Sequence, residues 1–435
     1  MRRDAIGASL ALLDELLEDY PRDFGVALWD GSHRGPDPGL PERFTLVLKH
    51  RGALRALLWP PSRLAMAEAY IHDDVDIEGD IHGVFPLGEH LVATRRTVAE
   101  RVRLARAVLS LPSERRPRLG RGPARVGGRR FSPERDRRAV TYHYDLSNDF
   151  FSLYLDQRMV YTCAYFASPE DDLETAQEQK LDYLCRKLRL QRGERLLDIG
   201  CGWGGLCLFA AEHYGVEALG ITISRPQADL ANERIHAAGL ADRCRVELVD
   251  YRELDAPEAF DKVVSVCMFE AVAEELLPDF FARAQSFIRP GGVFVNQGLG
   301  RRYHGAGAST SGRSFMGRYV FPEGSIVPIS TALRAAESAG LEVRDVEGLR
   351  EHYVLTLGHW VARLEARHDE AVRATDETQY RIWRLYMAGS GHAMATGRLN
   401  LYQLLLVKPD RGKSRLPLTR EEWYAAGRDR AAVTV

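Results

Sequence analysis

The stretch Arg195–Gly205, which reads RLLDIGCGWGG, decides the fold of this chain. Apolar residues lead into an acid, Asp198, and then into a turn with glycine at positions 200, 202, 204 and 205. A helical pattern follows in LCLFAAEHYG. Glycine permits a sharp reversal and lets backbone N–H groups approach a ligand that a Cβ atom would block. The stretch therefore predicts a buried parallel strand, a tight turn and a helix N-terminus that together bind a nucleotide-type ligand.

The glycine spacing also fits the G-x-G-x-x-G pattern of dinucleotide-binding folds, which alone is a weak signal. Such folds place an acid about 20 residues further on, at the end of the second strand, to bind the ribose 2′-OH. Here the second strand, VEALGITIS, ends in Thr222 and Ser224. The acid before the turn and a later Asp250-Tyr251 pair favour S-adenosylmethionine (SAM). A doubly wound fold whose Gly-rich turn binds no nucleotide is the alternative.

Length and composition set the broad class of the protein. With 435 residues the chain predicts two domains, and its net charge of −2 argues against a nucleic-acid partner. Six cysteines without C-x-x-C pairs indicate neither a disulfide framework nor a metal site. No apolar run of about 20 residues occurs, and acids interrupt the apolar run near the N-terminus. We expect a soluble or membrane-peripheral protein of the cytoplasm.

Residues 1–110 predict a small α+β domain. A helix is expected over residues 5–20, and short strand-like runs follow in FGVALWDG, FTLVLKH and ALRALLWP. Two helical zones come next, PSRLAMAEAYIHDDVDIEG and PLGEHLVATRRTVAERVRLARAVL. The domain is either a packing or dimerisation module or a module that presents lipid. Residues 111–138, rich in Arg, Pro and Gly, predict a linker whose arginines either contact anionic headgroups or are simply solvated.

The second domain is expected over residues 139–435. It opens with an aromatic segment, residues 139–166, whose density of rings exceeds what one buried helix face needs and predicts a lid over an apolar pocket. Strands then alternate with helical patterns, which predicts an α/β fold with a mostly parallel sheet and an antiparallel edge near LEVRDVEG and LYQLLLVK. Ligands bind at the carboxyl ends of such strands. The polar residues expected there are Asp198, Thr222, Asp250, Glu270 and Gln297.

The chain resembles cyclopropane-fatty-acyl-phospholipid synthases and the related mycolic-acid methyltransferases. The motifs that carry the resemblance run in the family's order through residues 139–408: YHYDLSNDFFSLYLD, MVYTCAYF, LLDIGCGWGGL, GITISRPQ, VDYREL, VVSVCMFEAV, RYVFPEG and GRLNLYQLLLVK. The N-terminal segment resembles, more weakly, the extra domain of phospholipid-acting bacterial members. The resemblance implies a class I SAM-methyltransferase fold with a Rossmann-like sheet. It also implies a cytoplasmic protein, peripheral at the inner face of the membrane, that acts on unsaturated phospholipid acyl chains and is compatible with a homodimer.

Enzymes of this family transfer a methyl group from SAM to an acyl double bond, and loss of a proton then closes a three-membered ring. An alkene is a poor nucleophile, so the sulfonium must be held in line in a dry site, and aromatic faces can stabilise the developing cation. By resemblance, the residues that bind SAM are Tyr161, Thr162, Asp198, Gly200, Gly202, Trp203, Gly204, Thr222, Ser224, Gln227, Asp250, Tyr251 and Arg252. Those of the substrate pocket are Tyr142, His143, Tyr165, Phe269 and His392.

Proton removal is the step at which this chain departs from the family. The resemblance implies a bicarbonate ion as the base, held by Cys163, Glu270 and Tyr319. The family's His ligand, however, is replaced by Gln297, and the Ile whose backbone amide binds the ion is replaced by Leu299. A glutamine can donate a hydrogen bond to an anion but carries neither charge nor proton. His392 is a candidate substitute for the base.

Three functions follow from these residues. The leading one is cyclopropane synthesis on phospholipid acyl chains. The second keeps SAM but loses the proton elsewhere, which gives a methylene- or methyl-branched chain, or else methylates a small natural product. The third is an inactive SAM-binding partner subunit, which the joint retention of Cys163, Glu270 and Tyr319 disfavours.

Overall fold

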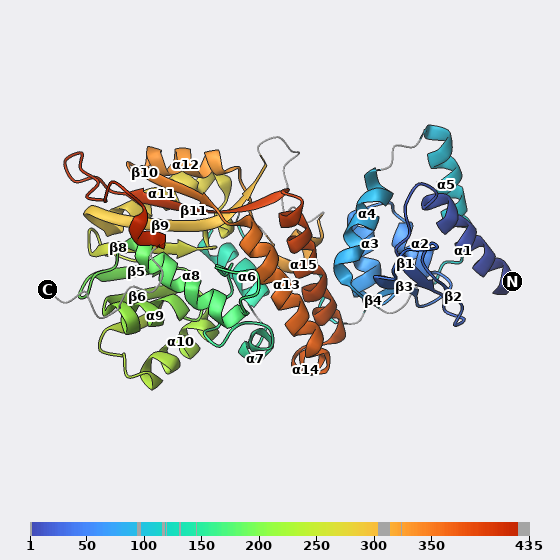
Figure 1. Ribbon diagram of the computed structural model, residues 1–435, viewed down its shortest axis with the longest axis horizontal. Coiled ribbons are helices and arrows are strands. Elements are labelled where there is room, and N and C mark those ends of the chain that lie inside the picture. The colour runs from blue at the N-terminus through green and yellow to red at the C-terminus, as the bar shows by residue number, and fades with distance from the viewer. Residues whose placement is uncertain are drawn as a thin grey trace. The chain divides into compact units, whose positions relative to one another are not determined.

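The computed structural model describes residues 2–93, 97–114, 118, 120–129, 132–144, 146–302, 314–322 and 324–424. The chain forms two compact units, shown in Figure 1. Unit 1 comprises Met1–Ala124, Ser311–Val320 and Arg367–His392, and unit 2 comprises Arg125–Thr310, Phe321–Ala366 and Ala393–Val435. Two segments from the C-terminal half therefore fold with the N-terminal part of the chain, which the predicted domain limits of 1–110 and 139–435 did not anticipate.

Unit 2 is built on a seven-stranded sheet. Its strands are β5 (Arg195–Ile199), β6 (Glu217–Thr222), β7 (Cys244–Leu248), β8 (Phe260–Val266), β9 (Ile288–Arg301), β10 (Glu342–Gly348) and β11 (Leu399–Val407). They lie in the order β10-β11-β9-β8-β5-β6-β7. Strands β5 to β9 pair in parallel, while β11 runs antiparallel to both β9 and β10. The predicted mostly parallel sheet with an antiparallel edge is confirmed.

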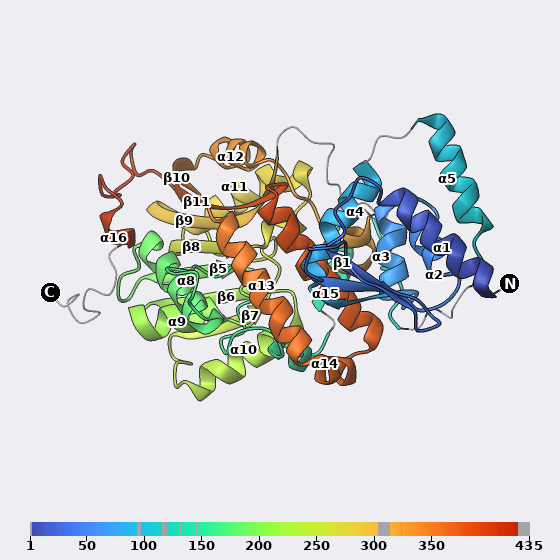
Figure 2. The same cartoon turned by 45° about the vertical axis from the view of Figure 1, so that its right-hand side comes forward.

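Helices cover both faces of this sheet. They are α6 (Pro133–Tyr144), α7 (Asn148–Ser152), α8 (Leu173–Leu188), α9 (Gly205–Tyr214), α10 (Arg225–Ala237), α11 (Leu277–Phe287), α12 (Ile329–Ser338), α13 (Arg350–Ala366) and α16 (Glu421–Tyr424). Buried side chains of α8, α9 and α10 form one apolar core with the sheet, and those of α11 and α12 form a second (Figures 1 and 2). Because β5 is covered on both faces, its run of apolar residues needs no alternation with polar ones.

Unit 1 contains a four-stranded sheet in the order β2-β1-β3-β4. Its elements are α1 (Arg2–Leu16), β1 (Phe24–Ala27), β2 (His33–Arg34), β3 (Phe44–Leu48), α2 (Ala53–Leu58), α3 (Arg63–Ile71), β4 (Val75–Gly79), α4 (Val84–Ala93), α5 (Val98–Ser110), α14 (His368–Ala374) and α15 (Glu377–Ala395), whose last three residues belong to unit 2. Two predictions were wrong here. The run ALRALLWP forms a helix, because Leu54 and Leu58 lie one turn apart and are buried together. The end of the first helical zone, VDIEG, forms a strand on which Val75 and Ile77 alternate with more exposed residues.

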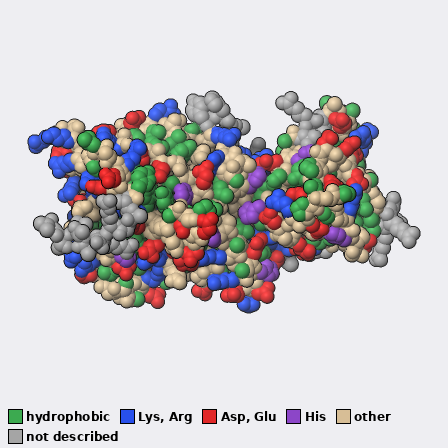
Figure 3. All heavy atoms as spheres, in the orientation of Figure 1, with side chains coloured by type: hydrophobic (Ala, Val, Ile, Leu, Met, Phe, Trp, Pro, Cys, Tyr) green, Lys and Arg blue, Asp and Glu red, His purple; other side chains and the backbone are tan. Residues whose placement is uncertain are grey.

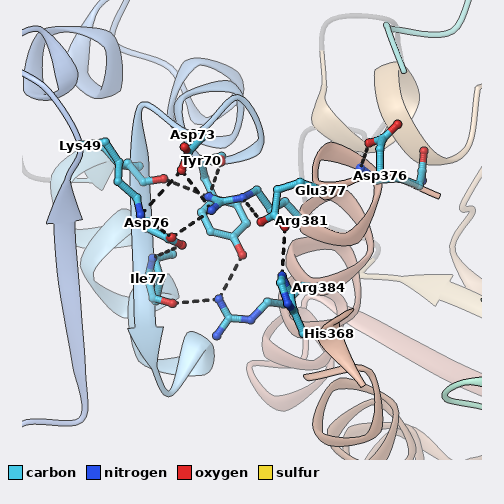
Figure 4. Close-up of polar contacts among 12 residues, drawn as sticks. Lys49, Tyr70, Asp73, Asp76, Ile77, His368, Asp376, Glu377, Arg381 and Arg384 are labelled. Carbon is cyan, nitrogen blue, oxygen red and sulfur yellow. Dashed lines mark hydrogen bonds and ion pairs between the residues drawn. The ribbon is translucent and has the colours of Figure 1, made fainter. Parts of the chain in front are cut away.

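A buried cluster of guanidinium groups explains why α15 folds with unit 1 (Figure 4). Arg381 donates to the carbonyl oxygen of Tyr70 at 3.1 Å and pairs with Asp76 at 2.9 Å. Arg384 donates to the hydroxyl of Tyr70 at 3.0 Å and to the carbonyl of Ile77 at 2.9 Å. These planar groups satisfy backbone oxygens at the end of α3 and along β4, so they fasten a helix from late in the chain onto the N-terminal sheet.

The predicted linker, residues 111–138, is not irregular to its end, because helix α6 begins at Pro133 and includes its last residues. Residues 115–117, 119, 130 and 131 of this linker lie outside the described part of the chain. Among the described residues, no helix has the length and apolar content needed to cross a bilayer. Figure 3 shows acidic and basic side chains interspersed over the visible surface, in keeping with the net charge of −2.

Candidate active site

The Gly-rich turn after β5 adopts a backbone that only glycine accepts readily. Gly200, Gly202 and Gly204 have φ values of +81°, +56° and +73°. A Cβ atom on Gly200 would lie 2.5 Å from Cγ of Met268, whereas one on Gly202 would meet nothing within 4 Å. The turn therefore leads into the N-terminus of α9 and leaves open space beside Gly202. A space that backbone amides can approach fits the carboxylate end of SAM.

A cavity of about 450 Å³ lies at the carboxyl ends of β6 and β7. Its lining residues are Arg137, Thr141, Tyr144, Ile223, Ser224, Arg225, Pro226, Leu248, Val249 and Asp250. Asp250 accepts hydrogen bonds from Nε and Nη2 of Arg252, at 2.9 and 2.7 Å, and Arg252 also binds Asp136 of α6 at 2.7 Å. Burial opposes ionisation of Asp250, but the bonds from Arg252 outweigh it and lower the pKa of the carboxyl. Arg252 thus holds Asp250 charged, while the neighbouring Tyr251 packs edge-on against Phe280.

Three other predicted cofactor residues form a local network beside this cavity. The hydroxyl of Thr222 donates to Oε1 of Gln227 at 2.9 Å and accepts from the backbone N–H of Ser224 at 3.2 Å. Asp198, one strand away, is buried, and burial raises the pKa of its carboxyl to about 7. We call this set, with the Gly-rich turn, Asp250 and Arg252, the cofactor pocket.

Aromatic side chains of the predicted lid segment gather around Tyr161. Its ring lies 5.2 Å from that of Trp360 and 5.3 Å from that of Phe151, centroid to centroid. Trp203 of the Gly-rich turn packs against Phe151 at 5.0 Å, and its indole N–H donates to Asn148 at 2.8 Å. The predicted lid segment and the Gly-rich turn therefore pack against each other through aromatic side chains.

The predicted substrate-pocket residues of unit 2 are placed as follows. His143 is buried and stacks on Phe321 at 4.1 Å and on Tyr161 at 5.8 Å. Tyr165 stacks on His352 at 4.6 Å. Phe269 is buried against β9, where a Cβ on Gly298 would collide with its ring, and Tyr142 is half-buried on α6.

Two buried side chains of α8, which the sequence patterns did not single out, hold the segment that carries Tyr161 and Thr162. The ammonium of Lys180 donates to the hydroxyl of Thr162 at 2.8 Å. The amide of Gln177 donates to the carbonyls of Val160 and Thr162 at 3.2 and 2.8 Å. Burial lowers the pKa of Lys180 to about 8, so this charge is held in a poorly solvated place.

Glu270 lies just after β8, and its carboxylate is buried. One oxygen accepts from the backbone N–H of Leu299 at 2.7 Å, and the other has no hydrogen-bond partner among the described residues. Burial raises the pKa of Glu270 to about 7, against the opposing effect of the Leu299 amide. The neighbouring Cys267, which acts to lower the pKa of this carboxyl, has a φ of +54°, a backbone conformation that costs a non-glycine residue about 1 kcal/mol. The geometry offers a partly unsatisfied proton acceptor in a dry site.

Gln297 is directed into the protein interior. Its Nε2 lies 3.8 Å from the sulfur of Cys267, and its Oε1 accepts from Gln403 at 2.8 Å. Gln403 in turn accepts from Lys187 of α8 at 2.8 Å. The side chain predicted to donate to an anion thus has both ends of its amide engaged within the protein.

Cys163 is buried, and burial raises the pKa of its thiol to about 12, so the sulfur is protonated and neutral. Thr356 lies within 3.9 Å of it. Glu270, Cys163 and Lys180 all lie close enough to Cys267 to influence the pKa of its thiol, so the structure gathers these groups. We call Cys163, Lys180, Cys267, Glu270 and Gln297 the polar cluster.

Two of the predicted site residues lie in unit 1. The hydroxyl of Tyr319, a residue only 1% exposed, donates to Glu68 at 2.8 Å. His392 bonds to Glu89 at 3.1 Å and stacks on Phe85 at 5.4 Å. These partners are 251 and 303 residues away along the chain, so no local pattern could identify them. Participation of Tyr319 and His392 in catalysis stays a prediction.

Comparison with known proteins places this geometry in a family. The sequence matches the family model described as mycolic acid cyclopropane synthetase over residues 131–404. It is 39% identical to a probable fatty acid methyltransferase of Pseudomonas putida, over 95% of this chain and 100% of that protein. It is 37% identical to tuberculostearic acid methyltransferase UfaA1 of Mycobacterium tuberculosis, over 64% of this chain and 66% of that protein. The solved structure of mycolic acid cyclopropane synthase CmaA1 complexed with SAH and CTAB aligns with a TM-score of 0.59 and 31% identity, over 62% of this chain and 97% of that one.

Proposed function

Because the chain belongs to the mycolic acid cyclopropane synthetase family and is a SAM-dependent lipid methyltransferase, we propose that it builds a one-carbon branch onto the double bond of an unsaturated phospholipid acyl chain. The observation that carries the proposal is the carboxylate of Glu270. It is buried, has a raised pKa and keeps one oxygen without a partner among the described residues. A base of this kind suits removal of a proton from a carbocation in a dry site.

Different residues of the site bind SAM and remove the proton. When bound, SAM supplies an electrophilic methyl group, and its attachment to one alkene carbon leaves the other carbon cationic. The cofactor pocket holds SAM, and the rings around Tyr161 exclude water and attract positive charge at about 0.5–2 kcal/mol each. Glu270, or a bicarbonate ion beside it, accepts the proton that discharges the cation.

We propose a methylene branch as the product. A hydride shift from the methylated carbon to its cationic neighbour moves the charge, and loss of a proton from the added methyl group then forms a C=CH₂ double bond, which is a methylene branch on the chain. No reductant is needed, whereas a saturated methyl branch would require one. Two observations favour this outcome. The amide of Gln297 is engaged by Cys267 and Gln403, and a relative that is matched over its whole length is named a probable fatty acid methyltransferase.

Ring closure is the second candidate. Here the proton leaves the added methyl group before any hydride shift, and the freed electron pair closes a three-membered ring on the cationic carbon. The gathering of Cys163 and Glu270 around Cys267 favours it, because most of the surroundings expected for a bicarbonate base are retained.

The test is an assay of the purified protein with SAM and vesicles of monounsaturated phosphatidylglycerol. We expect acyl chains heavier by one CH₂ and an equal amount of S-adenosylhomocysteine, as measured by mass spectrometry. Vesicles of saturated lipid are the control and should give neither product. Equal turnover on saturated and unsaturated chains, or none on both, would contradict alkylation of a double bond.

A further inference from the structure

Helix α5 of unit 1 carries an apolar stripe that nothing in the described part of unit 1 covers. Val98, Val102 and Leu109 are 77%, 44% and 42% exposed, and Ala105 lies between them. The spacing i, i+4, i+7, i+11 places these four side chains within about 60° of one another around the helix axis. An exposed stripe of this kind on a soluble protein marks a contact surface.

The stripe is separate from the side of α5 that packs on unit 1. Val108 and, just past the helix, Leu111 are buried, and they lie about 90° and about 150° around the axis from the centre of the stripe. Arg55 of α2 donates to the carbonyls of Leu109 and Leu111 at 3.0 Å, and Arg103 pairs with Glu15 of α1 at 2.6 Å. The helix is therefore anchored along one side while its apolar stripe stays exposed. The ribbon of α5 lies at the outside of unit 1 in Figures 1 and 2.

Two exposed arginines flank the stripe. Arg101 and Arg106 lie about 60° to 80° on either side of it, and no ion pair of either with a described residue is found. The acid of this helix, Glu100, is used in a capping box with Thr97 at the N-terminus. An apolar stripe between two guanidinium groups matches the boundary between acyl chains and anionic headgroups, where long cationic side chains reach outward.

We propose that α5 docks the protein on a bilayer surface that contains anionic lipid. This inference rests on the proposed function, because an enzyme that alkylates phospholipid acyl chains has to meet them at a membrane. The apolar stripe enters the interface, and Arg101 and Arg106 contact phosphate groups. Binding is reversible and sensitive to salt, because one short amphipathic helix buries little apolar area.

The experiment measures co-sedimentation of the full chain with vesicles of phosphatidylcholine, with and without phosphatidylglycerol. One variant combines Val98→Ser, Val102→Ser and Leu109→Ser, and a second combines Arg101→Gln and Arg106→Gln. The matched control combines Leu40→Ser, Val346→Ser and Leu418→Ser, exposed apolar positions elsewhere. A charge control combines Arg334→Gln and Arg373→Gln.

We expect the wild type to favour the anionic vesicles. The serine variant should lose about tenfold in partitioning, and the glutamine variant should lose about tenfold on anionic vesicles alone. Both control variants should bind as the wild type does. Unchanged binding of the serine variant would overturn the proposal, as would a dimer seen by sedimentation velocity that this variant abolishes without affecting vesicle binding. Methyl transfer to detergent-dispersed lipid, which requires no docking on a bilayer, is measured in parallel. Activity on this lipid without vesicle binding would count against the docking surface alone, whereas no activity on it would count against the proposed function.

Discussion

The cofactor pocket and the polar cluster of unit 2 are held together in different ways. In the pocket, several hydrogen bonds join residues two to five positions apart, such as Asp250 to Arg252 and Thr222 to Gln227, although Arg252 also reaches Asp136 of α6. In the cluster, the bonds reach much further, from Gln297 to Gln403 across 106 positions and from Glu270 to Leu299 across 29. A site made of local turns is robust to changes elsewhere, whereas the cluster depends on correct packing of several elements. We therefore expect substitutions in the cofactor pocket to impair SAM binding and substitutions in the polar cluster to impair proton removal, each without the other.

The largest expected effect is in the cofactor pocket. Gly202→Val places a branched side chain in the open space of the turn, so SAM affinity should fall more than a hundredfold while the protein stays folded. Gly193→Ala is the control, because Gly193 also has positive φ and open surroundings but lies before β5. Isothermal titration calorimetry measures both variants. Unchanged affinity of Gly202→Val would show that SAM binds elsewhere.

The second prediction concerns the polar cluster. Glu270→Gln removes the proton acceptor and should lower kcat more than tenfold while SAM affinity is kept. Since the pKa of Glu270 is about 7, its carboxylate is protonated below that pH, and kcat/KM of the wild type should fall as the pH drops through 7.

Glu274→Gln, at an exposed position a few residues on, is the control and should keep this acid limb. A Glu270→Gln protein with wild-type turnover, or a wild-type profile flat from pH 6 to 8, would remove Glu270 from the chemistry.

The contrast between local and long-range contacts also explains which parts of the molecule could be predicted from the sequence. The Gly-rich turn, the alternation of strands and helices after it and the place of Asp250 after a strand follow from local patterns, because their conformations are set by glycine and by apolar runs. Gln177, Lys180 and Cys267 do not, since a buried polar residue on an amphipathic helix or at a strand end looks like any other until its partner is known. Arg381 and Arg384 carry the segment 367–392 into unit 1 through contacts more than 300 residues apart.

The smallest expected effect separates two buried lysines of α8. Lys180 is 2% exposed and donates to the hydroxyl of Thr162, whereas Lys187 pairs with Glu347. Lys180→Met should weaken SAM binding several-fold with no loss of thermal stability, because it removes a desolvated charge. Lys187→Met leaves Glu347 without its cation and should cost about 1–3 kcal/mol of stability with SAM affinity kept. Melting temperatures and calorimetry check the pair, and identical behaviour of the two variants would argue against a role of Lys180 at the cofactor.

The most direct test of the central claim is proton NMR of phospholipids from a host that expresses the chain, with Glu270→Gln beside it. We predict the olefinic signals of a C=CH₂ methylene branch on acyl chains of the wild-type culture, and their loss in the variant. Upfield cyclopropane protons would contradict the methylene product and establish ring closure, and acyl chains without any added carbon would contradict the account as a whole.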